Sequence, residues 1–169
     1  MANIYRAIKI WNGSAWDYIY PSVGRSITFG ISADVSQSGG DIYMNSVLSA
    51  TAGNYFDHDT SIAALNSGKI KLLKAGRYAV FLNVFLSVNN YYGPGRIMIL
   101  IDGLDAIPAR FADSTISCWN TSKDCFAACA GMKKVAANTI IKAGCNCLTP
   151  GAYTFRKDAT FMTVAYLGE

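Results

Sequence analysis

The clearest hydrophobic pattern in the chain runs from Gly76 to Val88 and predicts a β-strand with two different faces. One face is apolar without interruption and consists of Tyr78, Val80, Leu82, Val84, Leu86 and Val88. The other face mixes polar residues with a small residue and two aromatics, and it consists of Arg77, Ala79, Phe81, Asn83, Phe85 and Ser87. Burial of both phenylalanines would contribute about 3–6 kcal/mol. We therefore expect Phe81 and Phe85 to be covered, either by a second layer of the same chain or by another copy of it.

Shorter apolar segments on both sides of this strand predict further strands joined by tight turns. Gly- and Asn-containing turn signals such as Asn66-Ser67-Gly68 and Asp102-Gly103 separate them. An Ala143-Gly144 turn is expected between two short strands near the C-terminus. The expected strands lie at residues 25–35, 42–50, 69–73, 96–101, 104–111, 125–135, 139–142, 145–148 and 159–167. About ten closely spaced strands without a long helical pattern predict an all-β sandwich or barrel.

Residues 1–23 carry a separate signal, that of a short β-hairpin. An alternating segment at residues 4–10 is followed by Asn12-Gly13, a favoured hairpin turn, and by an aromatic segment at residues 16–20. An isolated hairpin is marginally stable and needs a surface to pack against. The segment is therefore either the first element of the domain or a separate docking element, with candidate docking residues Trp11, Trp16 and Tyr18.

The composition gives a second reason to expect self-association. The chain has 169 residues, which suits one domain with a sizeable core. Hydrophobic residues make up 51% of it and charged residues only 15%, which is few for the surface of an isolated soluble monomer. Burial of part of the surface between copies would account for this balance.

Charge and hydropathy argue against two classes of partner. The net charge is +4 and the basic residues are scattered, so no stripe for binding nucleic acid is expected. No segment approaches 18 consecutive apolar residues, which argues against membrane insertion. The N-terminus also lacks the charged, apolar and cleavage-site sequence of an export signal.

The order of residues between 56 and 88 resembles the core of tumour-necrosis-factor-like jelly rolls, a superfamily that includes the globular head of the first complement component. In that superfamily a Phe-Asp pair, a Gly-Lys turn with alternating apolar residues, and a Gly-x-Tyr-x-apolar segment span two adjacent strands. The matching residues here are Phe56, Asp57, Gly68, Lys69, Ile70, Leu72, Gly76, Tyr78 and Val80. A later Asp-Gly turn, a Lys-Ala-Gly segment and a last strand ending near the C-terminus extend the resemblance over residues 25–169.

This resemblance implies a ten-stranded jelly-roll sandwich at residues 24–169. Members of the superfamily are tight homotrimers whose central aromatic strands meet around the threefold axis. The implied axial contacts are Phe81, Phe85, Phe161 and Tyr166. A closed symmetric oligomer of this kind also fits the low charge.

The segment Ile8 to Asp17 does not belong to that superfamily. It is similar to short tryptophan-containing modules in bacteriophage tail and fibre proteins, which often precede a trimeric head domain. This similarity implies that residues 1–23 dock the head onto other virion proteins, and that the protein is part of a virion assembled in the bacterial host cytoplasm.

The sequence contains no clear catalytic motif. The single histidine, His58, lies between Asp57 and Asp59, but the chain has no Gly-x-Ser-x-Gly or comparable nucleophile motif. We expect no enzymatic activity and no cofactor. Since some members of the resembled superfamily bind calcium, Asp57 and Asp59 are candidates for a metal site, and a solvated turn is the alternative.

Five cysteines lie in the last third of the chain, and their redox state is open at this point. They are Cys118, Cys125, Cys129, Cys145 and Cys147. Their spacing does not match the paired C-x2-C pattern of zinc sites. Buried thiols, one or two disulfides and a metal site all remain as alternatives. Because five is odd, at least one cysteine is free or pairs between chains.

Aromatic and amide residues in expected loops are the candidates for ligand binding. Tyrosine and asparagine in loops offer rigid stacking area with hydrogen-bonding ends, which suits saccharide or protein ligands. The candidates are Asn90, Tyr91, Tyr92, Tyr153 and Phe155, and packing over the sandwich edge is the alternative.

These patterns lead to one main hypothesis and two alternatives. The main hypothesis is a homotrimeric jelly-roll protein of a bacteriophage tail, baseplate or head fibre that attaches to a saccharide or protein on the host surface. The first alternative is a secreted complement-like or cytokine-like trimeric ligand of a protein receptor. The second is a capsid decoration protein without a ligand.

Overall fold

The fold is described from a computed structural model of the chain. The structure describes residues 8–11, 16–19, 25–37, 40–48, 59–88, 92–102, 110–119, 123–147 and 153–169. Within these ranges the secondary structure consists of β-strands and turns, with no helix, so the all-β prediction is confirmed.

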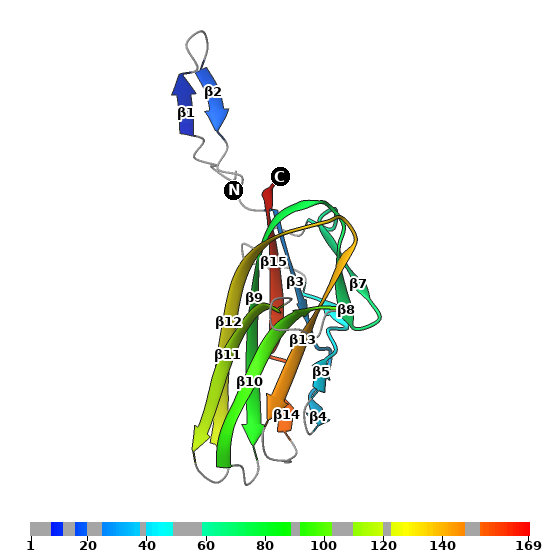
Figure 1. Ribbon diagram of the computed structural model, residues 1–169, viewed down its shortest axis with the longest axis vertical. Coiled ribbons are helices and arrows are strands. Elements are labelled where there is room, and N and C mark those ends of the chain that lie inside the picture. Colours follow the sequence, from blue (N-terminus) through cyan, green and yellow to red (C-terminus); the bar gives the residue numbers. More distant parts are fainter. Residues whose placement is uncertain are drawn as a thin grey trace, which may run out of the picture.

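Two antiparallel sheets form the body of the protein (Figure 1). The first has seven strands: β3 (Arg25–Gly30), β4 (Val35–Gln37), β6 (Ser46–Val47), β9 (Gly76–Val88), β12 (Lys123–Val135), β14 (Tyr153–Phe155) and β15 (Phe161–Gly168). The second has six strands: β5 (Gly40–Ile42), β7 (Ala63–Asn66), β8 (Lys69–Leu72), β10 (Tyr92–Ile101), β11 (Arg110–Trp119) and β13 (Thr139–Cys147). The described strands outnumber the ten expected because several are short edge segments of two to four residues.

Strand β9 organises the first sheet, as its hydrophobic pattern predicts. It has the predicted bounds and pairs with β12 along its whole length, from Val135 opposite Gly76 to Lys123 opposite Val88. Its other edge pairs with β15 and then with β14. A strand that is hydrogen-bonded on both edges in this way lies in the middle of its sheet.

The core lies between the two sheets and contains one face of each. On β9 the residues at positions 78, 80, 82, 84 and 86 are at most 1% exposed, which confirms the predicted inner face. The second sheet contributes Ile97 and Ile99 from β10 and Ile141 from β13, all fully buried. Alternation at period two therefore determines which side chains enter the core.

Tyr78 is the large polar residue of this core, and its hydroxyl is satisfied at the turn before β9. The hydroxyl can donate to the carbonyl oxygens of Ile62 (3.2 Å) and Lys74 (3.1 Å), and it accepts from the Lys74 N–H at 3.2 Å. Burial raises the pKa of Tyr78, so the neutral donor form is favoured. The hydroxyl thereby links the start of β9 to the segment before β7.

The edge of β9 has a gap at Phe85, between the end of its pairing with β15 and the start of its pairing with β14. Thr160, which is fully buried, fills this gap. Its hydroxyl accepts from the Phe85 N–H at 3.3 Å and lies 3.4 Å from the Phe85 carbonyl oxygen, which also accepts from the Arg156 N–H at 3.0 Å. A side-chain hydroxyl therefore replaces one rung of the backbone ladder.

Several sequence-based boundaries are wrong, and two of them show the physical reason most clearly. The expected Ala143-Gly144 turn is the middle of a continuous strand, β13, in which Ala143 pairs with Ile99 on one edge and Ile42 on the other. Strand β11 begins at Arg110 and continues to Trp119, whereas we expected the corresponding strand to end at residue 111. In both places backbone pairing with neighbouring strands outweighs local turn propensity.

The N-terminal hairpin is present as its own two-stranded sheet. Strand β1 (Ile8–Trp11) pairs antiparallel with β2 (Trp16–Ile19), with Trp11 opposite Trp16. The described residues of the hairpin pair with no strand of the sandwich. Its side chains, including those of Trp11, Trp16 and Tyr18, lie outside the described part, so the docking role remains a prediction.

We predict that Thr160→Val lowers the free energy of unfolding by about 1–3 kcal/mol, because it leaves the part-buried Phe85 N–H without its Thr160 acceptor. Urea unfolding at fixed protein concentration measures the change. Thr154→Val is the matched control, since the Thr154 hydroxyl pairs with Ser36 at an exposed position. We expect the control to change stability by no more than about 0.5 kcal/mol. Equal effects of the two substitutions would contradict a special role for Thr160.

Candidate functional site

The outward face of the first sheet is the main candidate for a functional surface. Cross-strand pairing aligns Phe126 of β12 with Phe85 of β9, and Ala130 with Phe81. On the other side of β9, Thr163 of β15 is opposite Phe81. These side chains point away from the core because their neighbours along each strand point into it. We call the surface formed by Phe81, Phe85, Phe126, Ala128, Ala130, Met132 and Phe161 the β9–β12 face.

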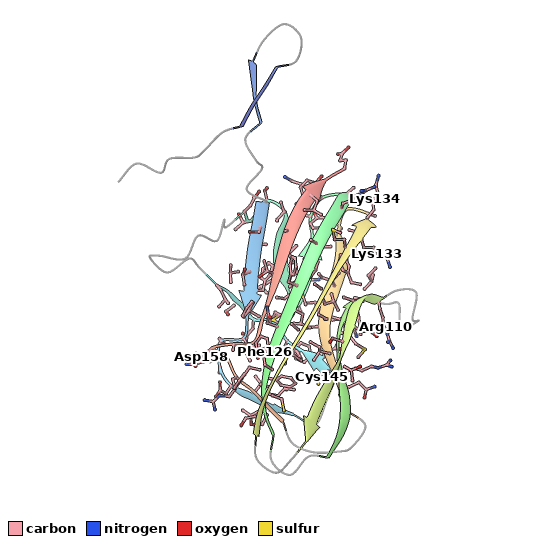
Figure 2. The ribbon with its side chains drawn as sticks, turned by 90° about the vertical axis from the view of Figure 1, so that its left-hand side faces the viewer. Arg110, Phe126, Lys133, Lys134, Cys145 and Asp158 are labelled. Carbon is pink, nitrogen blue, oxygen red and sulfur yellow. The ribbon has the colours of Figure 1, made fainter. Side chains whose placement is uncertain are left out.

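Large apolar side chains on this face are open to solvent in the single chain. Phe81 is 46% exposed, Phe126 is 61% exposed and Met132 is 76% exposed. Figure 2 views this side of the sheet, with Phe126 on the lower half of β12. Ala128 and Ala130 lie between the larger residues and are also exposed. Contiguous exposed apolar area of this kind makes the β9–β12 face a candidate interaction surface.

Phe81 and Phe85 thus lie on the predicted face, and the described part of the chain does not cover them with a second layer: Phe81 is exposed and Phe85 is half-buried. Phe161 also lies on this face, opposite Asn83. Contact of these three residues with another copy of the chain remains a prediction.

The placement of Tyr166 corrects an expectation. Tyr166 lies opposite Tyr78, with the two ring centroids 5.1 Å apart, and its hydroxyl donates to the carbonyl oxygen of Ala75 at 3.1 Å. It therefore packs against the core, on the other side of the sheet from Phe81. Residues 161 and 166 are separated by an odd number of positions, so a regular strand sends them to opposite faces.

Sequence reasoning missed Phe126 and Met132, which are the most exposed large residues of the face. A signal existed, because residues 125–132 are apolar or small at every position, as in a strand with both faces covered. Ala127 and Cys129 occupy the inner positions and are buried. The pattern alone did not reveal that β12 pairs with β9, and this pairing brings the two apolar outer faces together.

A second candidate surface lies at the end of the sandwich where several strands begin or end. Strands β9 and β11 end there and β10, β12 and β14 begin there, at the lower end in Figure 1. Register places the backbone of Tyr92 opposite Trp119, and that of Tyr153 opposite Val88. The fold therefore brings two predicted ligand-binding positions to one end, although their side chains, like Asn90 and Tyr91, lie outside the described part.

Phe155 does not belong to this candidate ligand surface. It is fully buried and belongs to the hydrophobic core, in strand β14 opposite Leu86. The expectation that Phe155 contacts a ligand is therefore wrong. The polar, turn-rich sequence around Phe155 concealed a three-residue strand that pairs with both β4 and β9.

The predicted metal position is only partly described. One carboxylate oxygen of Asp59 accepts the Ser61 N–H at 2.9 Å, an arrangement typical of an Asx turn. Asp57 and His58 lie outside the described residues. Within the described part, His, Cys, Asp and Glu side chains form no cluster suited to a metal ion. A calcium site at Asp57 and Asp59 has no further support.

The cysteines are in different states. Cys125 takes part in a disulfide, whereas Cys129 has a buried free thiol on the same inner face of β12. Cys145 on β13 is buried as well, and the side chains of Cys118 and Cys147 lie outside the described part. Burial, with a smaller contribution from the charge of Asp113, raises the pKa of Cys129 to about 11. Its neutral thiol is packed as a small apolar side chain.

Comparison with known proteins shows the fold and no closer relationship. No protein-family model matches the sequence, and no curated protein matches it. The solved structure of Eiger TNF from S. frugiperda has a TM-score of 0.60 at 11% identity, over 86% of this chain and 94% of that one. Structures of murine APRIL at pH 5.0 and pH 8.0 have TM-scores of 0.58 and 0.57, each at 12% identity, over 84% of this chain and 98% of theirs.

The similarity to these structures confirms that the chain has a tumour-necrosis-factor-like jelly-roll fold. At identities of 11–12% it is a likeness of fold alone. The described residues contain no helix long and apolar enough to span a membrane.

We predict that Cys129 resists alkylation at pH 8 in the folded protein and reacts after unfolding, because burial both blocks access and disfavours the thiolate. Mass spectrometry of the peptide containing Cys129 measures the modification. The raised pKa also predicts a pH effect: the thiol contributes stability below its ordinary value of 9.0, and this contribution is lost between about pH 9 and pH 11. Rapid labelling of Cys129 in folded protein at pH 8 would contradict the buried position.

Proposed function

We propose that the protein is a homotrimeric binding module of a bacteriophage virion that attaches to a ligand on the host surface. The β9–β12 face forms the contact between the three copies. The N-terminal hairpin docks the trimer to other virion proteins, and the loops at the Tyr92 and Tyr153 end contact the ligand. No residue has a catalytic role in this function.

The exposed β9–β12 face carries the proposal for self-association. The core of a two-sheet sandwich does not bury phenylalanine and methionine on the outer side of its central strands. Exposure of these side chains to water is unfavourable. Complete burial of an exposed side chain of this size contributes about 1.5–3 kcal/mol, and burial of Phe81, Phe126 and Met132 against other copies would contribute the share that corresponds to their exposed area. The resemblance to tumour-necrosis-factor-like proteins implies that these strands meet around a threefold axis.

The positions of the two ends support an attachment role. The first strand of the sandwich, β3, begins opposite the end of β15, with Arg25 paired to Tyr166. Strand β3 therefore begins at the end of the sandwich opposite to Tyr92 and Tyr153. A module with its anchor at one end and its loops at the other can present the loops to a surface.

The bacteriophage setting depends on the similarity of residues 8–17 to phage tail and fibre modules. The fold neighbours, which include an Eiger TNF, favour the alternative that the protein is a secreted trimeric ligand of a receptor. Gene neighbourhood separates the two readings: genes for virion components beside this one support the phage proposal. A capsid decoration protein would share that neighbourhood but bind no surface ligand.

We predict that the wild-type protein has a solution mass near three times 18.2 kDa and that Phe81→Asp with Phe126→Asp reduces it to 18.2 kDa. Two carboxylates on the β9–β12 face would be desolvated in the trimer and solvated in the monomer, so dissociation is favoured. Multi-angle light scattering measures the mass. Circular dichroism verifies that the variant remains folded, which is expected because both side chains are exposed in the single chain.

Tyr43→Asp is the matched control for this experiment. Tyr43 is 57% exposed, similar to Phe126, but its ring covers Gly68 in the turn between β7 and β8, away from the β9–β12 face. We expect the control to remain trimeric. A folded wild-type monomer, or equal dissociation of the double variant and the Tyr43→Asp control, would overturn the proposed interface.

We predict that the trimer binds an immobilised host-surface saccharide or protein about 10²–10⁴-fold more tightly than the dissociated Phe81→Asp/Phe126→Asp variant, because three linked sites gain avidity. Binding to an array of surface saccharides and to whole host cells measures this ratio. Equal binding by trimer and monomer would argue against multivalent attachment. Absence of any binding would instead support the decoration alternative.

A further inference from the structure

Arg77 and Lys134 form a like-charged pair at one end of the β9–β12 face. They lie directly opposite each other on the paired strands β9 and β12, and both side chains are exposed. Residues in such pairs have Cβ atoms about 4.5–5.5 Å apart, and like charges at this spacing are unfavourable. Figure 2 shows Lys134 at the upper end of β12, far from Phe126 on the same strand.

Within the described part of the chain, neither Arg77 nor Lys134 forms an ion pair with a carboxylate. Asp34, Asp41, Asp102 and Asp113 form ion pairs with other basic residues, namely Arg156, Lys142, Lys69 and Arg110. The side-chain hydrogen bonds of basic residues in the described part of the chain likewise involve neither Arg77 nor Lys134. Glu169 follows Gly168, which pairs with Arg77, and the Glu169 side chain is exposed.

The pair is continuous with the apolar surface. Lys134 follows Met132 on the outward side of β12, and Arg77 precedes Ala79 on the outward side of β9. Any arrangement that buries Phe81 and Met132 between copies must therefore bring Arg77 and Lys134 to the margin of the same interface. In a parallel threefold assembly, six positive charges would gather around the axis at the end where β9 begins.

We propose that this end of the trimer binds one tetrahedral oxyanion, phosphate or sulfate, on the threefold axis, held by Arg77 and Lys134 from all three copies. The inference rests on the trimer proposed above, and one chain supplies only a third of the site. An oxyanion neutralises charges that a neutral ligand cannot. Its several oxygens accept hydrogen bonds from guanidinium and ammonium donors on different sides.

The test is phosphate binding by the full chain, with chloride added to equalise ionic strength. Titration calorimetry should give one phosphate for three chains. At a phosphate concentration ten times the dissociation constant, the association constant of the trimer should increase about elevenfold, measured by light scattering on dilution. The same amount of charge supplied as chloride should not produce this increase.

Two substitutions that each remove one positive charge distinguish phosphate binding at this site from general electrostatic screening by phosphate. Lys134→Gln should abolish the phosphate response, and without phosphate its trimer should be at least as stable as wild type because repulsion is reduced. Lys157→Gln is the control and should retain the response, since Lys157 is exposed and adjacent in sequence to Asp158, which Figure 2 shows far from Lys134. Arg77→Gln gives a second, independent variant of the site.

Several outcomes would overturn the oxyanion site, and they can be distinguished from the outcome that would overturn the proposed trimer. A stable trimer that ignores phosphate, or that responds equally in Lys134→Gln and Lys157→Gln, overturns the oxyanion site and leaves the trimer intact. A Lys134→Gln trimer that dissociates more easily without phosphate would show that Lys134 has an attractive protein partner instead. A monomeric wild type overturns both proposals.

Discussion

The pairing of β9 on both edges is the constraint on which the rest of the structure depends. All thirteen residues of this strand pair with β12, and β15 and β14 share its other edge, with Thr160 bridging the gap at Phe85. The strand therefore cannot shift its register without breaking bonds on both sides. Its inner face supplies the centre of the core, and its orientation determines which side chains of β12 and β15 point outward.

The same constraint produces the apolar outer surface. Because β12 pairs with β9 over its full length, its exposed residues Phe126 and Met132 lie beside Phe81 and Phe85 rather than elsewhere on the molecule. A two-sheet sandwich has one interior, so apolar residues on the outer side of a sheet can be buried only by something outside the sandwich. The low proportion of charged residues, 15%, is what a chain needs if part of its surface is to be covered in this way.

The sandwich also separates its two ends. Both β3 and β9 begin at the end where β15 finishes, and that end carries Arg77 and Lys134. The other end carries the connections that precede β10, β12 and β14. Loops at that end can change without disturbing the β9–β12 face, since no residue of the face lies in them. A trimer built on the face would therefore hold three equivalent sets of loops in one direction.

The sequence by itself determined the class of fold and the two-faced character of β9, because period-two alternation depends only on local order along the strand. It could not determine which strands pair, and most errors follow from this. Ala143 and Gly144 have turn propensity, but pairing with β10 and β5 keeps them in a strand. Phe155 lies in a polar segment and is nevertheless buried, because β14 pairs with β9 in a register that points its ring inward. Only the tertiary structure placed Phe126 beside Phe85 and Lys134 beside Arg77, since neighbours across a sheet are decided by long-range hydrogen bonding and by the burial of the opposite face.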